Sequence, residues 1–127
     1  MQSVLLVDDD SAVLDTLSMM LRKIGYAVYQ AAGPDEAERM FRLHKGEISI
    51  AIIDRVISGG DGFLMACEYL GESPNLAVVV ISAFFDPSGT LFHSRFELLE
   101  KPVTVIALKT AIENALAKAN VNRLRAP

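Results

Sequence analysis

The sequence predicts an α/β domain with a doubly wound, five-stranded parallel sheet and helices on both faces. Short apolar runs rich in β-branched residues alternate with longer segments whose apolar residues recur at helical spacing. This alternation is typical of βα units, in which each strand is buried on both sides. Polar residues follow most of the short runs, as expected where parallel strands end at a ligand-binding edge.

The composition fits one globular domain. Of 127 residues, 51% are hydrophobic and 22% are charged, which suits a full core and excludes a disordered chain. The net charge of −4 gives no basic surface for nucleic acid or for an anionic membrane. A single cysteine excludes a disulfide framework, and no apolar run reaches the ~20 residues that span a bilayer. Without a signal-peptide pattern, the chain is expected to be cytoplasmic.

The first βα unit has the clearest pattern. Residues 4–7 are an apolar run and form the first expected strand. The helix after them places apolar residues on one face from Val13 onward. Ser11 is its expected N-cap, and Gly25 ends it as a C-cap residue.

Two more units follow the same scheme. Residues 27–31 form the second expected strand, and Pro34 suits the first turn of the next helix. Residues 49–53 form the third strand. A glycine-rich loop over residues 58–62 then leads to a helix over about residues 63–70.

The last part of the chain predicts two strands, over residues 77–81 and 98–100, and a long helix over about residues 105–119. The segment from residue 84 to residue 96 keeps no clean period, and a proline and a glycine interrupt it. A short helix over residues 88–94 and an irregular loop both stay open, so the fourth helix is expected to be short or irregular.

Polar side chains follow four of the five predicted strands. These residues are Asp8 and Asp9 after the first strand, Asp54 after the third, Ser82 after the fourth and Lys101 after the fifth. Parallel strands end at one edge of a sheet, so one pocket should gather three carboxylates, a hydroxyl and an ammonium. Three carboxylates so close repel one another and need a cation, and oxygen ligands favour a hard ion such as Mg²⁺.

Several of these residues also have a purely structural interpretation. The acids at residues 8–10 could favour a helix N-terminus, with Asp10 as a cap or surface residue. Asp61, followed by Gly62, is expected to form a turn and to cap the third helix. Cys67 stands at helical spacing from other apolar residues and is expected in the core rather than as a reactive thiol.

The chain resembles a receiver domain of the bacterial response-regulator family. The resemblance covers nearly the whole sequence and implies a flavodoxin-like sheet with strand order 2-1-3-4-5. It rests on motifs at strand ends, which are Asp8-Asp9, Asp54, Asp61-Gly62, Ser82-Ala83 and Lys101-Pro102.

The resemblance implies a phosphorylation-dependent switch of a two-component system. Asp54 would accept a phosphoryl group from a phosphohistidine of a sensor histidine kinase or a histidine phosphotransfer protein. Mg²⁺ would be held by Asp8, Asp9, Asp54 and the backbone carbonyl of Val56. The chain would then be one receiver domain over residues 1–127, or the N-terminal domain of a longer regulator. A downstream protein or a fused output domain would be its target, and a homodimer stays open.

Two further residues have implied roles at the phosphoryl group. Lys101 would pair with one phosphoryl oxygen, and Ser82 would bind another and draw its loop inward. The domain would not be an enzyme beyond its own phosphoryl transfer and a slow autodephosphorylation. The loss of phosphate is expected to be slow because Val56 and Phe84, which flank the phosphoryl group in the family, are apolar here.

The chain departs from the family pattern at four places. Ser58 stands where proline is usual, which should make its glycine-rich loop more mobile, and Arg55 stands where an apolar residue is usual. Leu98 replaces the usual aromatic residue, and the interval from Ser82 to Lys101 is short by about one helical turn. The last two departures predict that the surface of the fourth helix, fifth strand and fifth helix is not used for output in the usual way.

Two alternatives stay open. A pseudo-receiver would keep the fold but act as a protein-protein binding module without phosphate, although the complete set of site residues argues against it. A haloacid-dehalogenase-type phosphohydrolase would use Asp8 as its nucleophile. This more remote alternative lacks an acidic pair after Lys101 and leaves Asp54 without a role.

Overall fold

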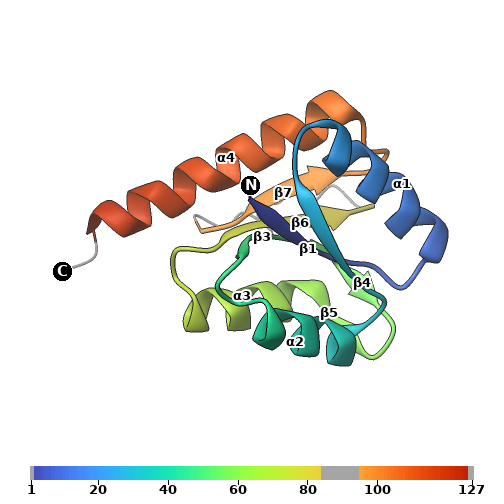
Figure 1. Cartoon of the computed structure of the whole chain (residues 1–127), viewed down its shortest axis with the longest axis horizontal. Helices are drawn as coiled ribbons and strands as arrows, with labels where there is room; N and C mark the ends of the chain where they lie inside the picture. The colour runs from blue at the N-terminus through green and yellow to red at the C-terminus, as the bar shows by residue number, and fades with distance from the viewer. Residues whose placement is uncertain (1, 84–94, 126–127) are drawn as a thin grey trace.

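The computed structural model describes residues 2–83 and 95–125 (Figure 1). The main sheet contains β1 (Ser3–Val7), β2 (Ala27–Ala31), β3 (Ile48–Asp54), β6 (Ala77–Ser82) and β7 (Glu97–Glu100). The helices are α1 (Ser11–Lys23), α2 (Pro34–Leu43), α3 (Gly62–Glu72) and α4 (Val105–Arg125). The short strands β4 (Val56–Ile57) and β5 (Gly60–Asp61) form a separate antiparallel hairpin.

The five strands of the main sheet are all parallel and lie in the order β2-β1-β3-β6-β7. Counted without the hairpin, this is the predicted order 2-1-3-4-5. The order reverses beside β1, so that β1 and β3 are neighbours at the centre. Such a reversal is where doubly wound sheets bind ligands.

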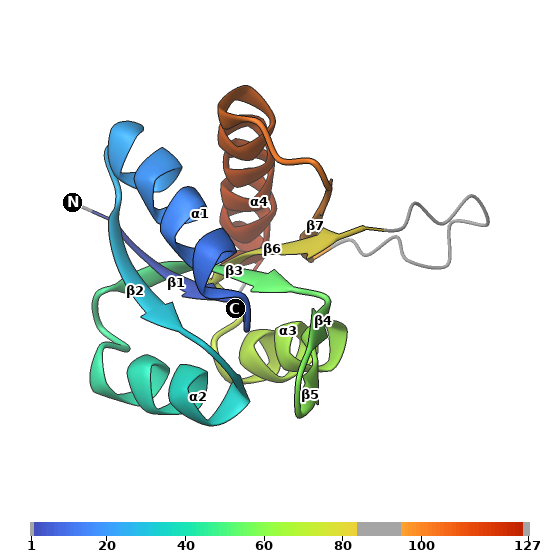
Figure 2. The same cartoon turned by 90° about the vertical axis from the view of Figure 1, so that its right-hand side faces the viewer.

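Helices cover both faces of the sheet. Figure 2 shows α1 and α4 on one side of the strands and α2 and α3 on the other. The strands supply alternate residues to the two cores: Leu5 and Val7 pack with α2 and α3, whereas Val4 and Leu6 pack with α1 and α4. Successive side chains of a strand point to opposite faces of the sheet, and both faces are buried here. The strands are therefore continuous apolar runs.

Several element boundaries match the prediction, and one helix start does not. The predicted N-cap Ser11 is wrong: Asp10 caps α1, and its carboxylate accepts hydrogen bonds from the amides of Ala12 and Val13. Both residue types cap helices well, so the sequence could not separate neighbours. Gly25 follows the end of α1 with a φ of +102°, as its predicted role requires.

The glycine-rich loop predicted at residues 58–62 contributes to the β4–β5 hairpin. Two other expectations need correction or lie outside the described residues. Cys67 is exposed rather than in the core, because α3 buries the neighbouring positions Ala66 and Tyr69 and turns Cys67 outward. The undecided segment at residues 84–94 lies outside the described residues. No helix among the residues described is long and apolar enough to cross a bilayer.

Candidate functional site

The polar residues predicted for the site lie along one edge of the main sheet. Asp8 follows β1, Asp54 ends β3, Ser82 ends β6 and Lys101 follows β7. The side chains of Asp8, Asp54 and Ser82 are buried, with residue exposures of 2%, 7% and 6%. Buried polar groups at such a position need hydrogen-bond or ionic partners.

Asp54 is paired with Lys101. The Lys101 Nζ atom lies 3.0 Å from Asp54 Oδ2, and the Val56 amide donates to Asp54 Oδ1 at 3.2 Å. The Lys101 amide also donates to the Ser82 carbonyl at 3.0 Å, which ties the end of β7 to β6. Asp54 therefore meets a cation from one strand end and a backbone donor from the loop that follows its own strand.

Asp8 has one satisfied and one unsatisfied oxygen. Its Oδ1 atom accepts a hydrogen bond from the Asp10 amide at 2.9 Å, whereas its buried Oδ2 atom has no hydrogen-bond partner among the described residues. Burial raises the pKa of Asp8 to about 6, and the neighbouring Asp54 carboxyl also raises it. A buried carboxylate oxygen without a partner, beside a second carboxylate, fits a hard divalent cation.

Asp9 does not join the other two carboxylates. Its side chain is exposed, and its Oδ2 atom accepts hydrogen bonds from the Ser58 amide at 2.9 Å and the Ser58 hydroxyl at 2.8 Å. The Ser58 amide and hydroxyl lower the pKa of Asp9. Within the described ranges, no three His, Cys, Asp or Glu side chains are grouped closely enough to hold a metal. The three predicted carboxylates are therefore not grouped in this structure, where Ser58 binds Asp9, and their role as metal ligands stays a prediction.

The remaining predicted residues are placed as follows. Ser82 lies opposite Glu100 in the β6–β7 register, at the point where β6 ends. Val56 lies in the hairpin and is 71% exposed, and its carbonyl role stays a prediction. Asp61 caps α3, where it accepts a hydrogen bond from the Phe63 amide at 2.9 Å, as predicted.

Arg55 and Ser58 have contacts that the sequence interpretation missed. The Arg55 guanidinium lies 4.6 Å from the centre of the Phe63 ring, so it stacks on the first turn of α3. The family pattern marks Ser58 only as a residue that stands where proline is usual, although a serine carries two donors that could bind a nearby acid. The residue type of Ser58 indicates that it can donate hydrogen bonds. The sequence does not identify the acceptor, because Asp9 lies 49 residues away in the chain.

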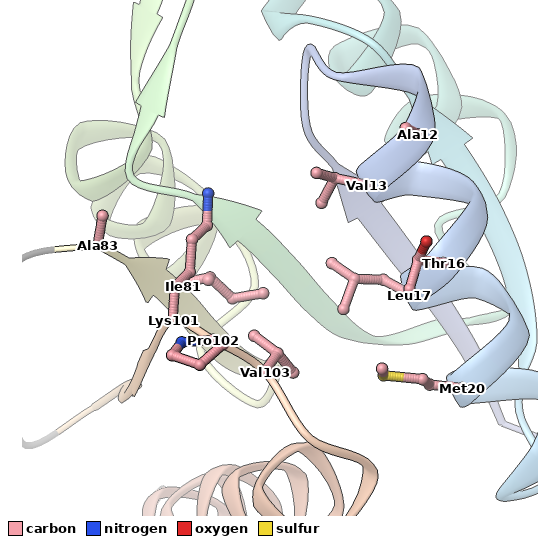
Figure 3. Close-up of a pocket in the computed structure, with 10 residues that line it drawn as sticks. All are labelled: Ala12, Val13, Thr16, Leu17, Met20, Ile81, Ala83, Lys101, Pro102 and Val103. Carbon is pink, nitrogen blue, oxygen red and sulfur yellow. The ribbon is translucent and has the colours of Figure 1, made fainter.

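A mostly apolar cavity of about 570 Å³ lies beside the strand ends. Figure 3 shows Val13 and Leu17 of α1 on one side of it and Ile81 and Val103 on the other. Lys101 also lines this cavity and extends from it toward Asp54. The charged site therefore adjoins an apolar depression that is open to the surface of α1.

Comparison with known proteins agrees with this geometry. Residues 4–113 match the family model described as the response regulator receiver domain. The two-component response regulator ARR11 of Arabidopsis thaliana is 32% identical over 118 residues, which cover 91% of this chain and 22% of that protein. The heme response regulator HssR of Staphylococcus aureus is 27% identical, over 96% of this chain and 54% of that protein.

A solved structure gives the same result for the fold. A response regulator receiver domain protein from Clostridium thermocellum superposes with a TM-score of 0.83 and is 27% identical; the match covers 95% of this chain and 98% of that one. The chain thus spans nearly all of a receiver domain, but only about a fifth of ARR11 and about half of HssR.

Proposed function

Because this chain belongs to the receiver-domain family of two-component response regulators, we propose that it is a signalling switch whose phosphoacceptor is Asp54. Receiver domains are signalling domains and not classical enzymes. The observation that carries the proposal is the contact between Asp54 and Lys101, which holds a buried carboxylate beside a cation at the sheet edge where ligands bind.

The proposed reaction transfers a phosphoryl group from a phosphohistidine. An oxygen of Asp54 attacks phosphorus, the P–N bond breaks, and its electron pair returns to the imidazole, so that an acyl phosphate forms on Asp54. Such a transfer depends on positioning and charge neutralisation. The Val56 amide orients the carboxylate, and Lys101 is placed to move from an Asp54 oxygen to an oxygen of the new phosphoryl group.

Receiver domains generally bind Mg²⁺, and the oxygen donors at this site fit it. Asp8, Asp54 and Asp9 would hold the ion together with the Val56 carbonyl. When bound, the ion would neutralise charge on the phosphoryl oxygens. The unsatisfied Oδ2 of Asp8 is the observation that supports a cation here.

Ser82 is the residue proposed to sense the phosphoryl group. It ends β6, so a new hydrogen bond from its hydroxyl would shift the chain that follows it. Leu98, where an aromatic residue is usual, packs against the core formed with α2 and α3. We therefore propose that output does not use in the usual way the surface that the family forms from its fourth helix, fifth strand and fifth helix, the last two of which are β7 and α4 here.

The partners follow from the chemistry of the site. A sensor histidine kinase or a phosphotransfer protein must bring its histidine to Asp54, so its surface must cover the strand ends. The apolar cavity lined by Lys101 and α1 offers contact area at that place. A downstream protein or a fused output domain would then read the phosphorylated state.

One observation favours a second candidate function, a binding module that works without phosphate. Asp9 is engaged by Ser58 and is therefore not held ready for a metal. In that case the hairpin and the site would be a fixed surface rather than a switch.

Incubation with Mg²⁺ and acetyl phosphate, followed by intact-mass measurement, separates these functions. We expect the wild type to gain one phosphoryl group and Asp54→Ala to gain none. Asp61→Ala is the matched control, since it removes another acid of the same segment that only caps α3. Absence of labelling would favour the binding module, and labelling mapped to Asp8 would favour the phosphohydrolase.

A further inference from the structure

Ser58 and Asp9 form a contact between the β4–β5 hairpin and the acidic residues after β1. Val56 pairs with Asp61 and Ile57 pairs with Gly60, so that Ser58 and Gly59 form the turn of the hairpin. Both donors of Ser58, its amide and its hydroxyl, point to the same oxygen, Oδ2 of Asp9. Two donors on one carboxylate oxygen make a charge-assisted contact that is stronger than a neutral hydrogen bond.

Two residues of the hairpin anchor it to the rest of the domain. Ile57 is 4% exposed and belongs to the core with α2 and α3. Gly60 lies so close to α2 that a Cβ atom on it would come within 2.7 Å of Pro34 Cγ. Ser58 is therefore presented to Asp9 by the turn of a hairpin that is anchored at Ile57 and Gly60.

We propose that Ser58 is a positioning residue that acts as a latch on Asp9: the hairpin turn and a divalent cation compete for the same carboxylate oxygen. The inference rests on the proposed function, in which Asp9 is a metal ligand. In the latched state, Asp9 faces the hairpin and is separated from the pair formed by Asp8 and Asp54. Metal loading then requires Asp9 to leave Ser58.

The latch also links the metal to the hairpin. If the contact between Ser58 and Asp9 lowers the affinity for the metal by some factor, then metal binding must lower the equilibrium constant of that contact by the same factor. Coupling between two equilibria is reciprocal. The hairpin turn at Ser58 and Gly59 would then be released from Asp9. The state of the metal site would thus reach a surface that lies apart from Ser82.

The first test measures Mg²⁺ affinity directly by isothermal titration calorimetry. Ser58→Ala removes the hydroxyl donor, so we expect Mg²⁺ to bind about three- to tenfold more tightly than to the wild type. Ser58→Thr keeps a hydroxyl and should bind Mg²⁺ like the wild type. Thr110→Ala, which removes an exposed hydroxyl from α4, is the control and should also be unchanged.

A second measurement needs no variant. In a Mg²⁺ titration of the ¹⁵N-labelled wild type, the amide resonance of Ser58 should shift with the same midpoint as that of Asp8, because its bond to Asp9 is lost. Equal or weaker binding by Ser58→Ala, or a Ser58 resonance that stays fixed while that of Asp8 moves, would overturn the latch. If neither the wild type nor Ser58→Ala binds Mg²⁺, the proposed function fails and the latch fails with it.

Discussion

Gly62 packs directly against the backbone of Asp54. A Cβ atom on Gly62 would lie 2.2 Å from the Asp54 carbonyl oxygen and 2.7 Å from the Arg55 Cα atom. Both are backbone atoms, so no side-chain rotation could relieve the clash. The Gly62 amide also donates to the Arg55 carbonyl at 2.8 Å. The absence of a side chain at residue 62 is thus what lets α3 begin against the end of β3.

Gly62→Ala is therefore expected to lower the free energy of unfolding by about 2 kcal/mol or more, because the backbone of β3 or α3 must shift. Urea denaturation measures this loss. Gly71→Ala is the matched control, since Gly71 is an exposed residue of the same helix with open space around its Cα atom. Alanine there should stabilise the protein by about 0.5–1 kcal/mol. Similar effects of the two substitutions would contradict the packing argument.

Lys101→Met is expected to destabilise the protein in the absence of Mg²⁺ by about 1–3 kcal/mol, because the buried Asp54 carboxylate loses its cation beside Asp8. Added Mg²⁺ should raise the free energy of unfolding more in this variant than in the wild type, since no ammonium competes with it. Denaturation with and without Mg²⁺ measures both effects. Lys109→Met, at an exposed position of α4, should change neither.

Tyr69 predicts a pH dependence that can be checked independently of the site. Burial raises the pKa of Tyr69 from 10.0 to about 12, since the fold favours the neutral phenol. Its contribution to stability is complete below the unfolded pKa and is lost as the pH rises from about 10 through about 12.

The matched comparison for this effect is Tyr69→Phe, which has no hydroxyl to titrate. Between about pH 9 and about pH 12, the wild type should lose about 2 kcal/mol more unfolding free energy than the variant. Other titrating groups are shared and cancel. A parallel decline of the two proteins would show that the phenol is not protected by the fold.

The lifetime of the phosphorylated protein should be long. Val56 is exposed beside Asp54 and has no polar group that could orient a water molecule for hydrolysis. We expect purified phosphorylated protein to keep its phosphoryl group far longer than seconds, and Val56→Gln to lose it several-fold faster. Leu64→Gln, an exposed apolar position on α3, is the control. Loss within seconds from the wild type would refute the expectation, as followed by intact mass over time.

The strands and the placement of Asp54 at a strand end could be predicted from the sequence because they depend on local patterns, whereas the strand order was available only through the family resemblance. A continuous apolar run that ends in an acid, such as the run before Asp54, predicts a buried parallel strand. The acid marks the end of that strand, which lies at the ligand-binding edge of the sheet. Asp61 was predicted as a cap because capping acts within one turn of the chain.

What the sequence could not supply depends on contacts between distant segments. The direction of the Asp9 carboxylate is decided by Ser58, and no local pattern reports that pairing. The prediction that Cys67 lies in the core was wrong for a different reason. Its spacing from Phe63 and Leu70 is compatible with one helix face, but the buried face of α3 is centred on Ala66 and Tyr69. A short, strongly apolar helix leaves its orientation open until its neighbours are known.

The position of β7 at the border of the sheet also affects self-association. An edge strand has backbone donors and acceptors on one side that can pair with another polypeptide. Such pairing is a common origin of aggregation. Here that strand is only four residues long, and a glutamate stands at each of its ends, Glu97 and Glu100. Two copies brought together along β7 would place these like charges near one another. We therefore expect that a dimer of this domain, where one forms, joins through its helices and not by extending its sheet.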